Sequence, residues 1–172
     1  MKAFFVPVFE RTRLPVLLYH IPQTSGVPIS VDLVRSLSSY DKLYGIKDSS
    51  GSPEGQLAFI KEFPKLKILT GSGRLITMNL QNGGGGAITG NGNVVPGETA
   101  ALFKDFRAGK DLAAAQARLD EASKIMPWDI AEMKFALGQL GLRESYCRPP
   151  HVEPSAAKKS ELKARIAQLK KA

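Results

Sequence analysis

The feature that most constrains the fold of this chain is a pattern repeated four times: a short apolar segment, a polar turn and an amphipathic segment. Short and largely apolar runs are typical of strands buried on both faces of a parallel sheet. The predicted strands cover residues 14–19, 42–47, 66–70 and 86–90. Consecutive strand–helix units predict an α/β fold with right-handed crossovers.

Recognisable helix starts follow the first two strands. Ser30 can cap a helix that carries Leu33 and Leu37 on one side. The run Ser52-Pro53-Glu54 offers a capping hydroxyl, a proline at the first helical position and an acid near the positive end of the helix dipole. Two further helices are predicted, one spanning Leu75 to Leu80 and one over residues 96–106.

The number of units limits the architecture. A closed (β/α)8 barrel needs eight units and about 250 residues, whereas this chain has 172 residues and four units. We therefore predict a partial TIM barrel over residues 1–108, followed by a C-terminal helical extension over residues 109–172 with helices at about 111–126, 129–140 and 155–172. An open four-stranded sheet is the alternative, whereas a half barrel cut open would expose two strand edges and an apolar face.

The segment before the first predicted strand has two interpretations. Residues 3–9 are apolar enough for a helix or for another strand. Pro7 in the middle of this segment disfavours both.

Charge and composition exclude several function classes. The formal net charge is +8, but six basic residues against one acid lie between Lys158 and Lys171, where Leu162 and Ile166 recur at helical spacing. This pattern is typical of the solvated face of a docked helix, so we expect no nucleic-acid partner. No apolar run approaches the roughly 18 residues of a membrane span. The single cysteine, Cys147, fits a reducing cytoplasm.

Strand alternation identifies a candidate reactive residue. It places Leu43, Gly45 and Lys47 on one face of the second strand. Tyr44, Ile46 and Asp48 lie on the other face. Lys47 then lies at the C-terminal end of a strand, where barrel active sites are found. Burial disfavours the ammonium form, and a neutral amine is required for attack on a ketone. By position alone, a lysine that extends to solvent is equally consistent.

Tyr19 ends the preceding strand in the equivalent position. Adjacent strands lie about 5 Å apart, so a phenol there could carry protons to a substrate held by Lys47. A half-buried tyrosine with its hydroxyl at the rim is the structural alternative.

Several motifs resemble one family. Residues 19–26 read YHIPQTSG and residues 45–50 read GIKDSS, similar to the YNxPxxTG and GxK(D/E)xS/T strand ends of the dihydrodipicolinate synthase and N-acetylneuraminate lyase family. The order and spacing of the two motifs fit. Residues 69–73, 84–89 and 148–150 resemble later parts of that family, so the resemblance covers nearly the whole chain as a C-terminal half.

The resemblance implies a chemistry and a set of roles. Family members form a Schiff base between the lysine and pyruvate or another 2-keto acid, and the tyrosine relays protons. By this correspondence Lys47 is the nucleophile, Tyr19 is the acid/base, and Ile88 and Gly90 line the substrate. Neither histidine belongs to a ligand cluster, so no metal or cofactor is implied.

Departures from the family motif bear on the substrate. Members that make dihydrodipicolinate carry an arginine shortly after the tyrosine, where this chain has Gln23 and Thr24. We therefore expect Thr24 to contact a 2-keto-3-deoxy sugar acid or a related hydroxy-keto acid. His20 replaces the usual asparagine and either contacts a polyol, lies at the surface or lies behind the site. The family's carboxylate-binding GTTGE loop has no counterpart here.

Three hypotheses follow. The first is a Schiff-base lyase or aldolase, metal-free, cytoplasmic and homo-oligomeric or paired with an N-terminal half. The second is an inactive fragment or a half barrel that needs a partner half. The third is nucleic-acid binding by the basic tail, which requires an affinity that falls steeply with salt.

Overall fold

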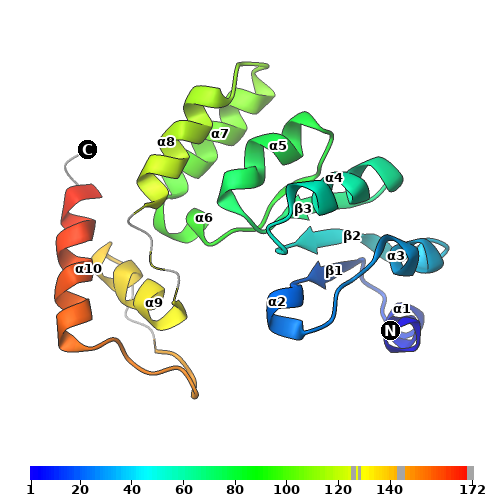
Figure 1. Ribbon diagram of the computed structural model, residues 1–172, viewed down its shortest axis with the longest axis horizontal. Helices are drawn as coiled ribbons and strands as arrows, with labels where there is room; N and C mark the ends of the chain where they lie inside the picture. The colour runs from blue at the N-terminus through cyan, green and yellow to red at the C-terminus, as the bar shows by residue number, and fades with distance from the viewer. Residues whose placement is uncertain (125–126, 128, 143–145, 170–172) are drawn as a thin grey trace. The chain divides into compact units, whose positions relative to one another are not determined.

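The structure is a computed structural model that describes residues 1–124, 127, 129–142 and 146–169. The chain divides into two compact units, residues 1–89 and 90–172 (Figure 1). The predicted division at residue 108 follows the strand–helix repeat, and it stays a prediction.

The first unit is built on a parallel sheet with strand order β1-β2-β3-β4. The strands are β1 (Val16–His20), β2 (Leu43–Asp48), β3 (Lys67–Thr70) and β4 (Gly86–Ala87). Within the described part of the chain, no further strand pairs with the outer edge of β1 or of β4. The predicted α/β fold with consecutive parallel strands is confirmed.

Helices connect these strands. They are α1 (Lys2–Arg11), α2 (Pro22–Ser25), α3 (Val31–Leu37), α4 (Pro53–Glu62), the 3₁₀ turn η1 (Gly73–Leu75) and α5 (Ile76–Gln81). Both predicted caps form: the Ser30 hydroxyl accepts from Leu33 N at 3.1 Å, and the Ser52 hydroxyl accepts from Gly55 N at 3.0 Å. Residues 3–9 are helical despite Pro7, so the strand alternative is wrong.

The core of this unit lies against one face of the sheet. Strand side chains pack there against buried residues of α1, α3 and α4 (the cluster includes Leu18, Ile46, Ile68, Phe9, Val34, Leu37 and Phe59). Burial of this apolar surface stabilises the packing of the helices on the sheet. The opposite face of the sheet lies outside this core cluster.

Strict alternation along β2 is wrong at its start. Leu43 packs in the core cluster with Ile46, whereas Tyr44 is half exposed. The cause is a register shift: Val16 pairs with Leu43, but the next residue of β1 pairs with Gly45, so Tyr44 is skipped. An extra residue of this kind is a β-bulge, and it reverses the facing of the residues before it.

The fourth strand is shorter than predicted. β4 contains two residues, although Ile88 N still donates to Thr70 O at 2.9 Å. Gly90 lies beyond the strand with helical torsion angles (φ −63°, ψ −28°). A short helix, Asn91–Val94, follows directly.

All regular secondary-structure elements described in the second unit are helices. Its helices are α6 (Asn91–Val94), α7 (Pro96–Arg107), α8 (Ala113–Ser123), α9 (Ile130–Gln139) and α10 (Ala156–Leu169). The helical prediction for the tail is confirmed, although Met126 and residues 170–172 lie outside the described residues. Among the helices described, none is both long and apolar enough to cross a membrane.

Helix α10 behaves as its sequence predicts. Leu162 and Ile166 are buried. Two of its lysines have acidic partners: Lys158 Nζ lies 2.9 Å from Glu161, and Lys159 Nζ lies 2.9 Å from Glu153. The described basic residues of α10 therefore lie on a helix that packs through its apolar side.

Candidate active site

Tyr19 and Lys47 face each other across neighbouring parallel strands. They are register partners near the C-terminal ends of β1 and β2. The Nζ atom of Lys47 lies 4.0 Å from the centroid of the Tyr19 ring. The two residues that the sequence analysis selected are thus brought together, with a cation held over an aromatic face.

The site lies on the sheet face opposite the core. Tyr19 is 49% exposed and its strand neighbour Leu17 is 38% exposed. Lys47 is only partly buried. The enclosed environment expected for Lys47 is therefore only partly present, because the neighbouring side chains of Tyr19 and Leu17 are substantially exposed.

The surroundings of Tyr19 favour its ionised form. Hydrogen bonding to the Ser49 hydroxyl is the largest effect, and it lowers the pKa of the phenol below its usual value of about 10. Partial burial opposes this by raising the pKa. Lys47 lowers it again through a hydrogen bond and through its positive charge. A phenol that loses its proton more readily is better suited to proton transfer near neutral pH.

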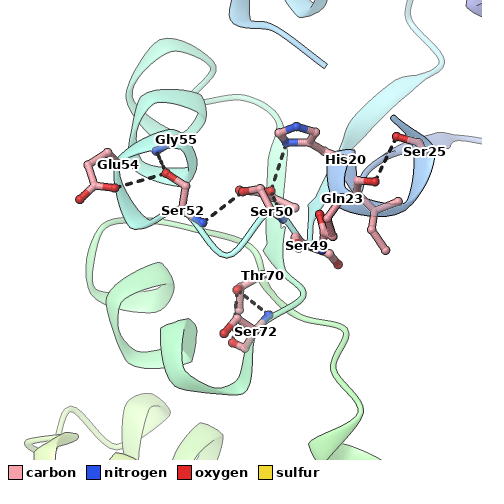
Figure 2. Close-up of polar contacts among 12 residues, drawn as sticks. His20, Gln23, Ser25, Ser49, Ser50, Ser52, Glu54, Gly55, Thr70 and Ser72 are labelled. Atoms are coloured by element: carbon pink, nitrogen blue, oxygen red, sulfur yellow. Dashed lines mark hydrogen bonds and ion pairs between the residues drawn. The ribbon is translucent and has the colours of Figure 1, made fainter. Parts of the chain in front are cut away.

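Ser49 is held in place by three features. Its backbone N donates to His20 O at 2.8 Å, and its carbonyl accepts from Gln23 Nε2 at 2.7 Å (Figure 2). Its hydroxyl occupies space beside Gly71, where an added Cβ would lie 1.9 Å from Ser49 Oγ. Glycine at position 71 therefore makes room for the hydroxyl that acts on Tyr19.

Replacing Ser49 by alanine should raise the pKa of Tyr19. The substitution removes the largest effect that lowers it, so the tyrosinate should appear at a higher pH than in the wild type. The measurement is a pH titration of tyrosinate absorbance, with the signal of Tyr19 isolated by subtracting a Tyr19→Phe titration. The other three tyrosines cancel in this difference.

Ser50→Ala is the matched control for this titration. The Ser50 hydroxyl accepts from Ser52 N at 3.2 Å and has no part in the shift of Tyr19. An unchanged midpoint in Ser49→Ala, or an equal rise in Ser50→Ala, would contradict the assignment.

Gln23 and Thr24 lie in α2, directly after β1. Both are exposed, and Gln23 is tied to Ser49 through its amide nitrogen. Thr24 N donates to Ile21 O at 3.1 Å. The place of the family's arginine thus holds two neutral polar side chains next to the strand ends.

Ile88 and Gly90 differ in their settings. Ile88 follows β4 in the first unit and is 47% exposed. Gly90 is the first residue of the second unit and directly precedes α6. Their predicted contact with the substrate stays a prediction.

His20 and Asp48 are the next register pair after Tyr19 and Lys47. Both are buried, and the His20 ring meets the Phe59 ring edge to face at 5.8 Å. Of the three interpretations of His20, the position behind the site is confirmed.

Sequence reasoning missed Ser49 and Gly71. Ser49 follows Lys47 by two residues, so continued alternation along the strand would have placed both on one face. The role of Gly71 depends on a contact across strands. Within the ranges that the structure describes, no three histidine, cysteine, aspartate or glutamate side chains gather closely enough to hold a metal ion.

Comparisons with known proteins agree on one family. A family model described as the dihydrodipicolinate synthetase family matches residues 1–169. A DapA-like lyase of Chloroflexus aurantiacus is 47% identical over 106 residues, covering 60% of this chain and 36% of its own length. A 4-hydroxy-tetrahydrodipicolinate synthase of Anaplasma marginale is 30% identical, over 92% of this chain and 54% of the relative.

Solved structures share the fold. YagE, a prophage protein of E. coli K12 solved in complex with pyruvate, is 28% identical with a TM-score of 0.86, covering 99% of this chain and 62% of that protein. A 2-keto-3-deoxygluconate aldolase of Sulfolobus, at 20% identity and a TM-score of 0.84, shows the same fold over 59% of its length. This chain therefore spans less than two thirds of the relatives that it matches.

Proposed function

Because the chain belongs to the dihydrodipicolinate synthetase family, we propose that it carries the Schiff-base chemistry of a lyase or aldolase acting on a 2-keto acid. Lys47 is the nucleophile and Tyr19 the proton carrier. The observation that carries the proposal is the position of Lys47 Nζ, 4.0 Å from the Tyr19 ring at the ends of two paired strands.

The proposed reaction begins at the Lys47 amine. Its lone pair attacks the ketone carbon, and the carbonyl oxygen takes a proton from Tyr19. The carbinolamine then loses water to leave a protonated imine. The imine accepts the electron pair when a C–H or C–C bond at the adjacent carbon breaks, which gives an enamine. The Tyr19 phenolate takes the proton of the broken C–H bond, or, when the C–C bond breaks, the proton of the substrate hydroxyl that becomes the carbonyl of the released aldehyde. Stabilisation of that developing carbanion, rather than of the substrate, accelerates the reaction.

Pyruvate or a 2-keto-3-deoxy sugar acid is the proposed substrate. Gln23 and Thr24 are neutral and exposed beside the strand ends. They suit hydroxyl groups better than a second carboxylate, which an arginine would hold bidentately. We propose Thr24, Ile88 and Gly90 as substrate contacts.

The proposed setting has three parts. The chain works as the later half of a barrel, with a second copy or an N-terminal half as partner. A single cysteine in the sequence supports a cytoplasmic location. None of the proposed steps uses a metal or an organic cofactor.

The second candidate is a half barrel that is inactive without a partner half. Two observations favour it: the open outer edges of β1 and β4 in the described residues, and the partly exposed Leu17 and Tyr19 on the site face. Size-exclusion mass and urea unfolding distinguish the candidates. A monomer that unfolds without a cooperative transition indicates an incomplete unit.

Reductive trapping tests the proposed chemistry. The wild-type chain is incubated with pyruvate and borohydride, which should fix the imine as one reduced pyruvyl group on Lys47. Peptide mass mapping locates the adduct. We expect Lys47→Arg to give no adduct, because a guanidinium that stays protonated cannot form the imine.

Lys42→Arg is the matched control for trapping, because Lys42 is an exposed lysine that precedes β2. It should keep the adduct. Labelling spread over many lysines, or an adduct that survives in Lys47→Arg, would reject Lys47 as the nucleophile. Lack of an adduct in the wild type would favour the second candidate.

A further inference from the structure

A second pair of side chains lies directly behind Tyr19 and Lys47. His20 and Asp48 are the next residues along β1 and β2 and are also register partners. Successive residues of a strand point to opposite faces, so this pair lies on the core side of the sheet. His20 is 9% exposed and Asp48 is 2% exposed.

The two side chains are in close electrostatic contact. Nδ1 of His20 lies 3.1 Å from Oδ1 of Asp48. Neither ring nitrogen of His20 makes a hydrogen bond within the described residues. Asp48 Oδ1 also accepts from Ser50 N at 2.9 Å. A buried carboxylate thus bridges the imidazole and the turn after β2.

Core packing alone does not explain this pair. Burial of polar groups is unfavourable unless they are well hydrogen-bonded, and two apolar side chains would fill the same space at lower cost. Leu18 and Ile46, two residues earlier on the same strands, are apolar and fully buried. A polar pair at this one register position therefore points to a role in fixing geometry.

The pair holds both ends of the segment that carries Ser49. The Asp48 carboxylate closes the turn through Ser50 N. The backbone of His20 accepts from Ser49 N at 2.8 Å. Any change in the spacing of His20 and Asp48 therefore moves Ser49, and with it the hydroxyl that faces Tyr19.

We propose that His20 and Asp48 are positioning residues that lock the ends of β1 and β2, so that the Tyr19 phenol, the Ser49 hydroxyl and the Lys47 amine stay aligned. The inference rests on the proposed function, since alignment matters only if these groups react. The contact on which it depends is the one between Nδ1 of His20 and the Asp48 carboxylate.

Two substitutions of His20 separate its ring nitrogens. The amide nitrogen of asparagine lies as many bonds from the backbone as Nδ1, whereas that of glutamine corresponds to Nε2. His20→Asn should therefore keep a donor beside Asp48, and His20→Gln should lose it. Asp48→Ala removes the carboxylate itself.

The readout is the titration of Tyr19, followed by tyrosinate absorbance with Tyr19→Phe subtraction. We expect the midpoint in His20→Asn to match the wild type. His20→Gln and Asp48→Ala should raise it toward the value of about 10 for an unperturbed tyrosine. Val34→Ala is the control for general loosening, because it truncates a buried side chain of α3 and should leave the midpoint unchanged.

Two results would overturn the proposal. The first is a wild-type midpoint in folded His20→Gln or Asp48→Ala, and the second is an equal rise in Val34→Ala. If these variants fail to fold, nitrogen NMR of the wild-type imidazoles still decides. The spectrum should show a protonated Nδ1 in His20, assigned by its loss in His20→Asn, and a bare Nδ1 would reject the pair.

These measurements need neither substrate nor turnover. Failure of reductive trapping would remove the proposed function of Lys47 but leave the Tyr19 titrations of the His20 and Asp48 variants standing. A normal adduct with an unchanged Tyr19 midpoint in every variant would instead reject the positioning role of His20 and Asp48 and leave the proposed function of Lys47 standing. The two proposals therefore fail separately.

Discussion

Tyr19→Phe should abolish most of the catalysed exchange of the pyruvate methyl protons with solvent. Exchange requires proton transfer at the carbon next to the imine, and Tyr19, whose ring centroid lies 4.0 Å from Lys47 Nζ, is the proposed acid/base. Loss of a positioned acid or base typically lowers such rates by about 100- to 10,000-fold. The rate is measured by proton NMR as pyruvate in heavy water loses its methyl signal.

The imine itself should survive this substitution. Phenylalanine keeps the ring under the Lys47 amine, so the borohydride adduct should still form, although more slowly. Tyr44→Phe is the control, because Tyr44 is a half-exposed tyrosine outside the core cluster and should exchange at the wild-type rate. Equal exchange by wild type and Tyr19→Phe would remove Tyr19 from the mechanism.

Gly45→Ala should destabilise the first unit strongly. An added Cβ at position 45 would lie 2.1 Å from the carbonyl oxygen of Lys67 and 3.0 Å from Leu17 Cδ2. The first contact is with backbone, so β2 and β3 must separate. Overpacking of this kind costs about 3 kcal/mol, which corresponds to a fall in melting temperature of roughly 6–12 °C for a chain of this size.

Gly97→Ala provides the comparison. Gly97 lies in the first turn of α7, and a Cβ there would meet nothing within 4 Å. Alanine is the better helix former by roughly 0.5–1 kcal/mol, so the melting temperature should hold or rise. A Gly45→Ala variant that melts with the wild type would show that the strands relax at no cost.

Loss of the adduct should accompany loss of stability in Gly45→Ala. Position 45 lies two residues before Lys47 on the same strand face. A displaced β2 therefore carries the amine away from Tyr19. Trapping yield and melting temperature measured on the same sample test this link.

Local signals in the sequence predicted much of the first unit. The caps at Ser30 and Ser52 depend on residues within three positions, and both formed. The pairing of Tyr19 with Lys47 follows from two strands that end in equivalent places. Each of these predictions needs only local chemistry and the regular geometry of parallel strands.

Features that depend on neighbouring strands escaped prediction. The skipped Tyr44 and the two-residue β4 are set by how adjacent strands meet. The same is true of the site. The Ser49 hydroxyl has its place because Gly71, on the next connection, leaves a gap.

The gap beside Gly71 also limits how this family member can change over generations. Positions 49 and 71 share one volume, since a methyl group at position 71 would occupy the space of the Ser49 hydroxyl. A lineage that gains a side chain at position 71 must first shrink the residue at position 49, and thereby loses the group that acidifies Tyr19. We therefore expect substitutions at the two positions to be coupled, so that a side chain at position 71 is tolerated only after the residue at position 49 has become smaller.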